Sequence, residues 1–261
     1  MKGLIIKDVM CLKKQLMIFA YVLIGVLVVS VMYVLSARFG NIALAGKEML
    51  ATDQLSGIDV KNLGSIALVL FMLLPPATVC DMVNVFEADG KAGFHKVAAS
   101  LPVSLRKRVL SKYLTIYTLF LIGAFVDILI AVLLSGITDL ITLKDFLGII
   151  VSSVSVMCIY SAFVIFFCIL LGCGKEMYAQ ILSIVTMLLV VIIINFNTIK
   201  GIIISIVKSG EEDSVGDISF IWNMLDFIKE RSYVFLIAAV FNSVASFVLS
   251  WIIAERKRGV I

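Results

Sequence analysis

Asp127 is the one carboxylate of this 261-residue chain that lies well inside a long apolar run. A charge at such a depth is costly in a membrane unless it is protonated, paired or facing water. Two interpretations stay open at this point. The carboxyl is hydrogen-bonded to a Ser, Thr or Asn of a neighbouring helix, or it belongs to a translocation path or a proton relay. Asp127 is therefore our candidate for a residue of a translocation path.

His95 is the single histidine of the chain, and it lies between Phe94 and Lys96 in a polar, basic segment. Intramembrane hydrolases need a nucleophile with a base, or a metal held by several His and carboxylate ligands. No such partner is spaced for His95, so we expect a surface or interface role for it. The sequence predicts no catalytic residue and no metal site.

The chain also lacks a nucleotide-binding loop of the form Gly-x-x-x-x-Gly-Lys-Ser/Thr, whose amides cradle phosphates and whose hydroxyl holds magnesium. Gly174-Lys175 comes nearest, but Ile169 stands at the first glycine position and Glu176 replaces the hydroxyl. We therefore expect this chain to bind no cofactor and to hydrolyse no ATP.

The composition is that of an integral membrane protein. Hydrophobic residues make up 62% of the chain and charged residues 15%, whereas soluble domains have about 45–50% and about 25%; the mean hydropathy is +1.14. This excludes nucleic-acid-binding modules and soluble cofactor enzymes. A spanning helix needs roughly 20 apolar residues. Six runs qualify, at residues 16–35, 63–83, 114–134, 146–171, 179–199 and 233–254.

The predicted fold is thus all-α, a polytopic membrane protein with six transmembrane helices. The pair Pro75-Pro76 predicts a kink in the second helix. Small and polar residues follow one another at fourfold spacing in the last helix, from Ala238 through Asn242 and Ser246 to Ser250. Such a row lets helices approach closely, and we expect it to serve helix packing rather than to line a substrate path.

Basic residues gather in the segments that this topology puts on one side of the membrane. They are Lys2, Lys7, Lys13, Lys14, Lys91, Lys96, Arg106, Lys107, Arg108, Lys112, Lys175, Arg256, Lys257 and Arg258. The opposite loops hold most of the acids. The positive-inside rule makes the basic side cytoplasmic and, with six crossings, places both termini inside the cell.

We expect one transmembrane domain over residues 1–261, with three special segments. Residues 1–15 have the pattern of an amphipathic helix lying at the membrane interface; the alternative is a basic flank that only anchors the first crossing. Residues 84–112 form a cytoplasmic helical elbow between the second and third helices, broken at Pro102. Residues 200–231 resemble a hairpin that dips into the outer interface.

The elbow residues resemble the cytoplasmic loop of small type-two ABC export permeases of Gram-positive bacteria. In that family an acidic stretch, an aromatic residue, a Ser-Leu-Pro-Val-Ser turn and a Lys-Tyr pair follow the second helix. The matching residues here are Glu87 and Asp89, Phe94, Ser100 to Ser104, and Lys112-Tyr113. The chain start, Met1 to Asp8 with Lys13-Lys14, and the six-helix plan are also similar. Phe94 departs from the family, where tryptophan is more usual, but it keeps a flat apolar anchor.

The resemblance implies a permease that works with a second permease subunit, identical or related, and with a separate ABC ATPase that binds ATP and magnesium. It makes the elbow around Glu87, Asp89, Phe94 and His95 the coupling region that docks onto the ATPase. It also implies residence in the bacterial plasma membrane among lipids. The implied cargo is an amphipathic peptide, a toxin or a lipophilic drug, as in phenol-soluble modulin and antimicrobial-peptide exporters that confer resistance.

Two other functions remain as alternatives. One is a proton-coupled secondary transporter that uses Asp127, for which paired repeats and more buried ionisable groups are expected. The other is a non-transporting membrane subunit for immunity or signalling, because a fold alone does not determine a function.

Overall fold

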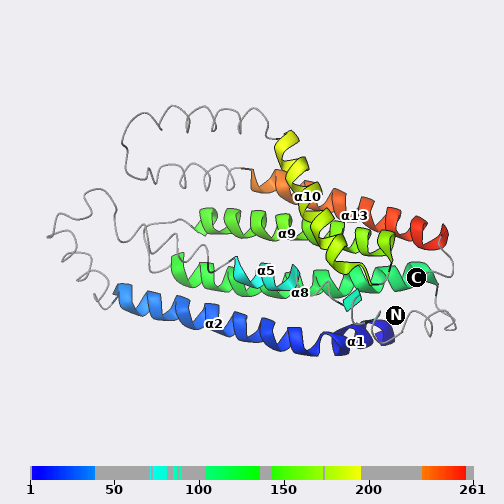
Figure 1. Ribbon diagram of the computed structural model, residues 1–261. Coiled ribbons are helices and arrows are strands. Elements are labelled where there is room, and N and C mark those ends of the chain that lie inside the picture. Colours follow the sequence, from blue (N-terminus) through cyan, green and yellow to red (C-terminus); the bar gives the residue numbers. More distant parts are fainter. Residues whose placement is uncertain are drawn as a thin grey trace.

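The computed structural model of the chain is built from helices throughout the part that it describes, which comprises residues 2–38, 71, 73–80, 85–86, 89, 104–135, 143–172, 174–194 and 231–256. The helices are α1 (Lys2–Cys11), α2 (Lys13–Arg38), α5 (Leu74–Cys80), α8 (Leu105–Ser135), α9 (Leu143–Leu171), α10 (Glu176–Ile194) and α13 (Ser232–Arg256) (Figure 1). The all-α prediction is confirmed for these residues. Most of the predicted elbow, with Glu87, Phe94 and His95, and residues 200–230 of the predicted outer hairpin lie outside them.

Four of these helices are long and apolar enough to cross a membrane. The spans are Lys13–Tyr33, Leu105–Leu133, Leu143–Leu171 and Ser232–Arg256. They correspond to the first, third, fourth and sixth apolar runs of the sequence. The fifth run is represented by α10, whose apolar stretch Glu176–Val190 is shorter, and the second run by α5. Pro75 and Pro76 occupy the first turn of α5, where a missing amide hydrogen costs no helical hydrogen bond.

The N-terminal helix α1 is separate from α2. Leu12 interrupts the helix between α1 and α2, and it is buried. The polarity of α1 differs from the expected amphipathic pattern, because Asp8 is buried whereas Ile6 and Met10 are exposed. The reason is that α1 packs against the charged beginning of α8 rather than against an apolar surface.

The directions of the helices follow from their contacts. Asp8 of α1 meets Lys112 of α8, Phe19 of α2 lies beside Gly123, and Val26 shares a buried cluster with Ile130. Therefore α2 and α8 run parallel.

The helices α9 and α13 run in the opposite direction to α8. Ser246 and Asn242 of α13 bond to the Ala162 and Ile159 carbonyls of α9 in the same order along both helices, so these two helices are parallel to each other. Tyr113 of α8 contacts Ser246 and Tyr117 contacts Ser243, an antiparallel order. The beginnings of α8 and α10 and the ends of α9 and α13 therefore lie with α1 at one end of the bundle, which we call the basic end (right in Figure 1).

A tight turn joins α9 to α10 at the basic end. Gly172 and Gly174 have φ angles of 84° and 85°, in the left-handed region that only glycine adopts without strain. The Gly172 amide donates to the Cys168 carbonyl at 3.0 Å and so caps α9. The short turn predicted between the fourth and fifth crossings is confirmed.

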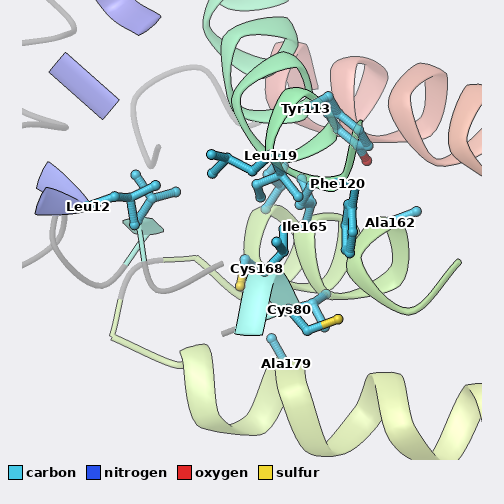
Figure 2. Close-up of a cluster of buried hydrophobic side chains, with 14 of the residues drawn as sticks. Leu12, Cys80, Tyr113, Leu119, Phe120, Ala162, Ile165, Cys168 and Ala179 are labelled. Carbon is cyan, nitrogen blue, oxygen red and sulfur yellow. The ribbon is translucent and has the colours of Figure 1, made fainter. Parts of the chain in front are cut away.

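The core is built around α8, which contacts α1, α2, α5, α9 and α13. Its buried residues alternate at spacings of three and four, the pattern of a helix packed along one seam. The α8 seam comprises Val109, Tyr113, Ile116, Phe120, Gly123, Asp127 and Ile130. Figure 2 shows Tyr113, Leu119 and Phe120 of α8 beside Ala162, Ile165 and Cys168 of α9, with Cys80 of α5 and Ala179 of α10 adjoining them.

Candidate functional site

Four charged side chains meet at the basic end. Lys7 and Asp8 come from successive positions of α1, Asp89 follows α5, and Lys112 lies on the second turn of α8. Lys112 Nζ lies 2.8 Å from Asp8 Oδ1, and Lys7 Nζ lies 3.0 Å from the same oxygen. Lys7 Nζ is also 2.6 Å from Asp89 Oδ1, and Lys112 forms an ion pair with Asp89. We call these four residues the charge network.

The charge network is largely shielded from solvent. The side chain of Asp8 is 1% exposed and that of Lys112 is 10% exposed. The network has equal numbers of positive and negative groups. The Ser111 hydroxyl shares its one hydrogen between the Arg108 carbonyl at 2.8 Å and Asp8 Oδ2 at 3.3 Å. Buried ions are tolerated when they are paired and hydrogen-bonded in this way. Removing one member therefore leaves an uncompensated charge in a poorly hydrated place.

Lys7 shows the balance between burial and pairing. Burial lowers the pKa of Lys7, but the hydrogen bonds and charges of Asp89 and Asp8 outweigh it and raise the pKa above its ordinary value. Lys7 is thus held in its charged form by the two carboxylates. This favours a permanent connection between α1 and the segment that contains Asp89.

Asp89 is the one predicted coupling residue that the structure describes. Its carboxylate contacts Lys7 of α1 and Lys112 of α8, so it ties the segment after α5 to both helices. Glu87, Phe94 and His95 lie outside the described residues. Sequence reasoning missed Lys7, Asp8 and Lys112 as members of a site. A signal was available, because Asp8 is the only acid among the four lysines of the first fifteen residues.

Aromatic rings accompany the cations at this end. The Phe86 ring lies 5.4 Å from Lys112 Nζ, and the guanidinium of Arg106 lies 4.8 Å from the centre of the Trp251 ring. Both are favourable cation–π distances. Trp251 Nε1 donates to Glu255 Oε1 at 2.7 Å. The beginning of α8 is therefore joined to the end of α13 as well as to α1.

Hydroxyl groups join α8, α9 and α13 farther from the basic end. Ser246 Oγ donates to the Ala162 carbonyl at 2.7 Å, so the 2.6 Å contact between Ser246 and Tyr113 uses the Tyr113 hydroxyl as donor. Ser250 lies 3.3 Å from the same Tyr113 oxygen. The prediction that the small-polar row of the last helix serves packing is confirmed for Asn242, Ser246 and Ser250. Ala238 does not continue it, because Ala238 is exposed and Ala239 is buried instead.

Asp127 is buried like Asp8, but it differs from Asp8 in having no polar partner among the described residues. Its side chain is 0% exposed, and neither carboxylate oxygen has a hydrogen-bond partner. A cluster of buried apolar residues lies next to it on the seam: Val26, Ile130, Ala131, Phe146, Ile149 and Ile150. The buried residues Ser30 of α2 and Ser152 of α9 lie within about one turn of this cluster. The first interpretation, a hydrogen bond to a neighbouring Ser, Thr or Asn, is therefore not observed in the described part. The Ser30 hydroxyl on α2 donates to its own helix, at the Val26 carbonyl.

No group of three or more His, Cys, Asp or Glu side chains within the described ranges is arranged to hold a metal ion. The geometry at the basic end is instead that of a mechanical junction, where charges connect three segments. This junction lies at one end of a bundle of helices that are long and apolar enough to span a membrane.

The chain belongs to the ABC-2 transporter family. A family model described as "ABC-2 family transporter protein" matches residues 57–257, most of the chain. No curated protein and no solved structure matches it. Proteins of this family are membrane components of transport systems, the permeases of ABC transporters, and in general they work with an ABC ATPase. The charge network joins Asp89 and Lys112, inside the matched region, to α1, which precedes it.

Proposed function

We propose that this chain is the permease subunit of an ATP-driven exporter in the plasma membrane of a Gram-positive bacterium. Family membership supports the permease assignment, and the resemblance of the elbow supports the exporter class. The proposed cargo is an amphipathic peptide, a toxin or a lipophilic drug. The observation that carries the mechanism is Asp89, whose carboxylate binds α1 and α8 at once.

The proposed topology has six crossings with both termini in the cytoplasm. The helix α2 runs away from the basic end, whereas Asp89, later in the chain, lies at the basic end. Between them in sequence is α5, which packs against α2, α8 and α9. A return crossing through α5 accounts for this. With α2, α8, α9, α10 and α13, it makes six crossings in one domain over residues 1–261. The cations at the basic end favour the cytoplasm for that end.

The proposed coupling passes through the charge network. Glu87, Phe94 and His95 are the residues that contact the ATPase, with Phe94 as the apolar anchor. When the closing ATPase displaces the elbow, Asp89 carries the displacement to Lys7 on α1 and to Lys112 on α8. Because α8 is the central helix of the bundle, its movement changes the packing of the helices around it. ATP and magnesium remain in the ATPase, and this chain supplies no cofactor site.

The proposed assembly includes a second permease subunit, identical or related, and surrounding lipid. Only 17–39% of the most apolar window of each spanning helix is buried within the chain. The remaining apolar surface is available to lipid and to the second subunit. The cargo path is proposed to lie between the two subunits, which alternate between inward-open and outward-open states.

The test is affinity purification of the tagged protein from native membranes, with mass spectrometry and ATPase activity of the eluate. We expect a P-loop ATPase in stoichiometric amount, and we expect Phe94→Ala to reduce its recovery, because a central aromatic anchor often dominates an interface. Phe125→Ala is the matched control, since Phe125 is 62% exposed on the membrane-spanning part of α8.

The outcomes separate the coupling from the family assignment. Equal ATPase recovery with Phe94→Ala and Phe125→Ala would remove Phe94 from the coupling region while keeping the ATPase partner. A crosslinked preparation without any ATPase would contradict the ATP-driven function and favour a non-transporting subunit. Cargo class is tested by the sensitivity of a deletion strain to cationic amphipathic peptides and lipophilic drugs, with restoration by the wild-type chain.

A further inference from the structure

Two carboxylates of the described part are almost entirely buried, and their surroundings differ. Asp8 is 1% exposed and has Lys7, Lys112 and Ser111 as partners. Asp127 is 0% exposed and has none. Asp8 is an ion within a neutral network, whereas Asp127 is a lone carboxyl on the α8 seam, about four helical turns beyond Lys112, the α8 partner of Asp8. We therefore expect the protonation state of Asp127 to differ from that of Asp8.

 

Asp127 lies where four helices meet. Gly123, one turn earlier on the α8 seam, has no side chain, and a Cβ built there would lie 3.6 Å from Phe19 Cζ of α2 and 3.7 Å from Pro75 Cβ of α5. On the other side, Ile130 packs with Phe146 and Ile150 of α9. The carboxyl is therefore covered by the chain's own helices, so a charged group of a second subunit does not reach it in this conformation.

An ionised carboxylate without a partner is very unfavourable in such a place, and buried acids take up a proton instead. A bound metal cation is a poor alternative, because hard cations need six or more oxygen ligands and Asp127 offers two. We propose that Asp127 is a proton-binding site: its carboxyl holds a proton in this conformation and gives it to water when α5 separates from α8 at Gly123.

Near this level, the titratable and charged groups on the helices that pack against α8 are few: Tyr33 on α2, Lys144 and Asp145 on α9, and Tyr233 on α13. Cys80 on α5, Cys158, Tyr160 and Cys168 on α9, and Lys7 and Asp8 on α1 lie nearer the basic end. None of them donates a hydrogen bond to the Asp127 carboxyl. Its proton is therefore exchanged with water and not with a side chain of the described part.

The reaction is a simple proton transfer. The O–H bond of the Asp127 carboxyl breaks, its electron pair stays on the carboxylate, and a water molecule becomes hydronium. The proton returns when the helices close over the carboxylate again. This step deepens the proposed function, because an alternating permease would then take up and release one proton per chain in each cycle, and acid would favour the closed arrangement.

The test is infrared spectroscopy of the full chain at neutral pH, without ATPase or cargo, in a detergent that contains no carbonyl group, such as an alkyl maltoside. We expect a carbonyl stretching band of a protonated carboxylic acid in the wild type. The band should be lost in Asp127→Asn and kept in Asp8→Asn, the matched control at the other buried carboxylate. Alkaline solution should remove the wild-type band only as the helices open to water.

A band that survives in Asp127→Asn, or a wild type without any such band, would overturn the proposal. Folding is checked by helicity and by thermal unfolding. Because the amide is neutral and of similar size, Asp127→Asn should unfold at the wild-type temperature, and a large loss of stability in this variant would also contradict a neutral carboxyl. If that variant cannot be purified, Asp127→Glu serves instead, and it should retain the band at a shifted position. Since no ATPase is present, these results are independent of the Phe94→Ala experiment.

Discussion

Replacing Lys112 by Met tests the charge network most directly. Lys112 is 10% exposed, and it pairs with Asp8 at 2.8 Å and with Asp89. Methionine keeps much of the side-chain volume but leaves two carboxylates to share Lys7. Breaking a buried pair by removing one partner costs about 3–5 kcal/mol. Because Lys7 Nζ stays 3.0 Å from Asp8, we expect a value near the lower limit, about 3 kcal/mol.

The assay follows unfolding in detergent by the reaction of buried thiols with a fluorogenic maleimide. Cys80 and Cys168 are 8% and 5% exposed, so they react when the bundle opens. The double variant Asp8→Asn with Lys112→Met removes one charge of each sign and should recover more than half of the lost stability. Exposed Lys107 provides the control, since Lys107→Met breaks no described ion pair. If Lys112→Met and Lys107→Met unfold alike, the charge network does not hold α1 to α8.

Two further predictions concern Gly123 and Lys7. Gly123→Ala should be tolerated or slightly stabilising, by up to about 1 kcal/mol, because its Cβ would meet Phe19 at an ordinary contact distance of 3.6 Å. Gly123→Leu should instead cost about 1–3 kcal/mol of stability through overpacking. Equal thermal unfolding of the two variants would show that α2 and α5 do not pack closely on α8 at this position. The pKa of Lys7 is raised in the folded state. The contribution of Lys7 to the stability is therefore complete below the ordinary lysine pKa and is lost as the pH rises through the pKa of the folded state. Unfolding measured as a function of pH should show this alkaline loss of stability in the wild type and not in Lys7→Met.

The helices could be predicted well because length and hydropathy decide them in a membrane. The four spanning helices fall on four of the predicted runs, with ends extended by a few residues. Hydropathy alone does not extend α8 back to Leu105, because its first turns carry Arg106, Lys107 and Arg108; Ser104, a residue type that favours the helix N-cap, predicts this start instead. These turns stay helical because Ser104 accepts the first backbone hydrogen bonds, from the Lys107 and Arg108 amides.

The site was predictable only in part. Asp127 was identifiable because a lone acid in an apolar run stands out, but its lack of a partner depends on which faces of α2 and α9 meet it. Asp89 was identified by resemblance, whereas its partners Lys7 and Lys112 are 82 and 23 positions away in sequence. Positive residues near membrane ends are expected for topology alone, so nothing in their spacing distinguishes the two lysines that form ion pairs.

The contact between α9 and α13 also bears on how the protein is made. Among the helices that the structure describes, α13 packs most extensively on α9, yet α9 ends at Leu171 and α13 begins at Ser232. At about 5–20 residues per second, α9 spends several seconds in the membrane before its main partner leaves the ribosome. During that time Ser246 is not yet there to bond to the Ala162 carbonyl. A chain released early would therefore present this unfinished surface of α9 to lipid.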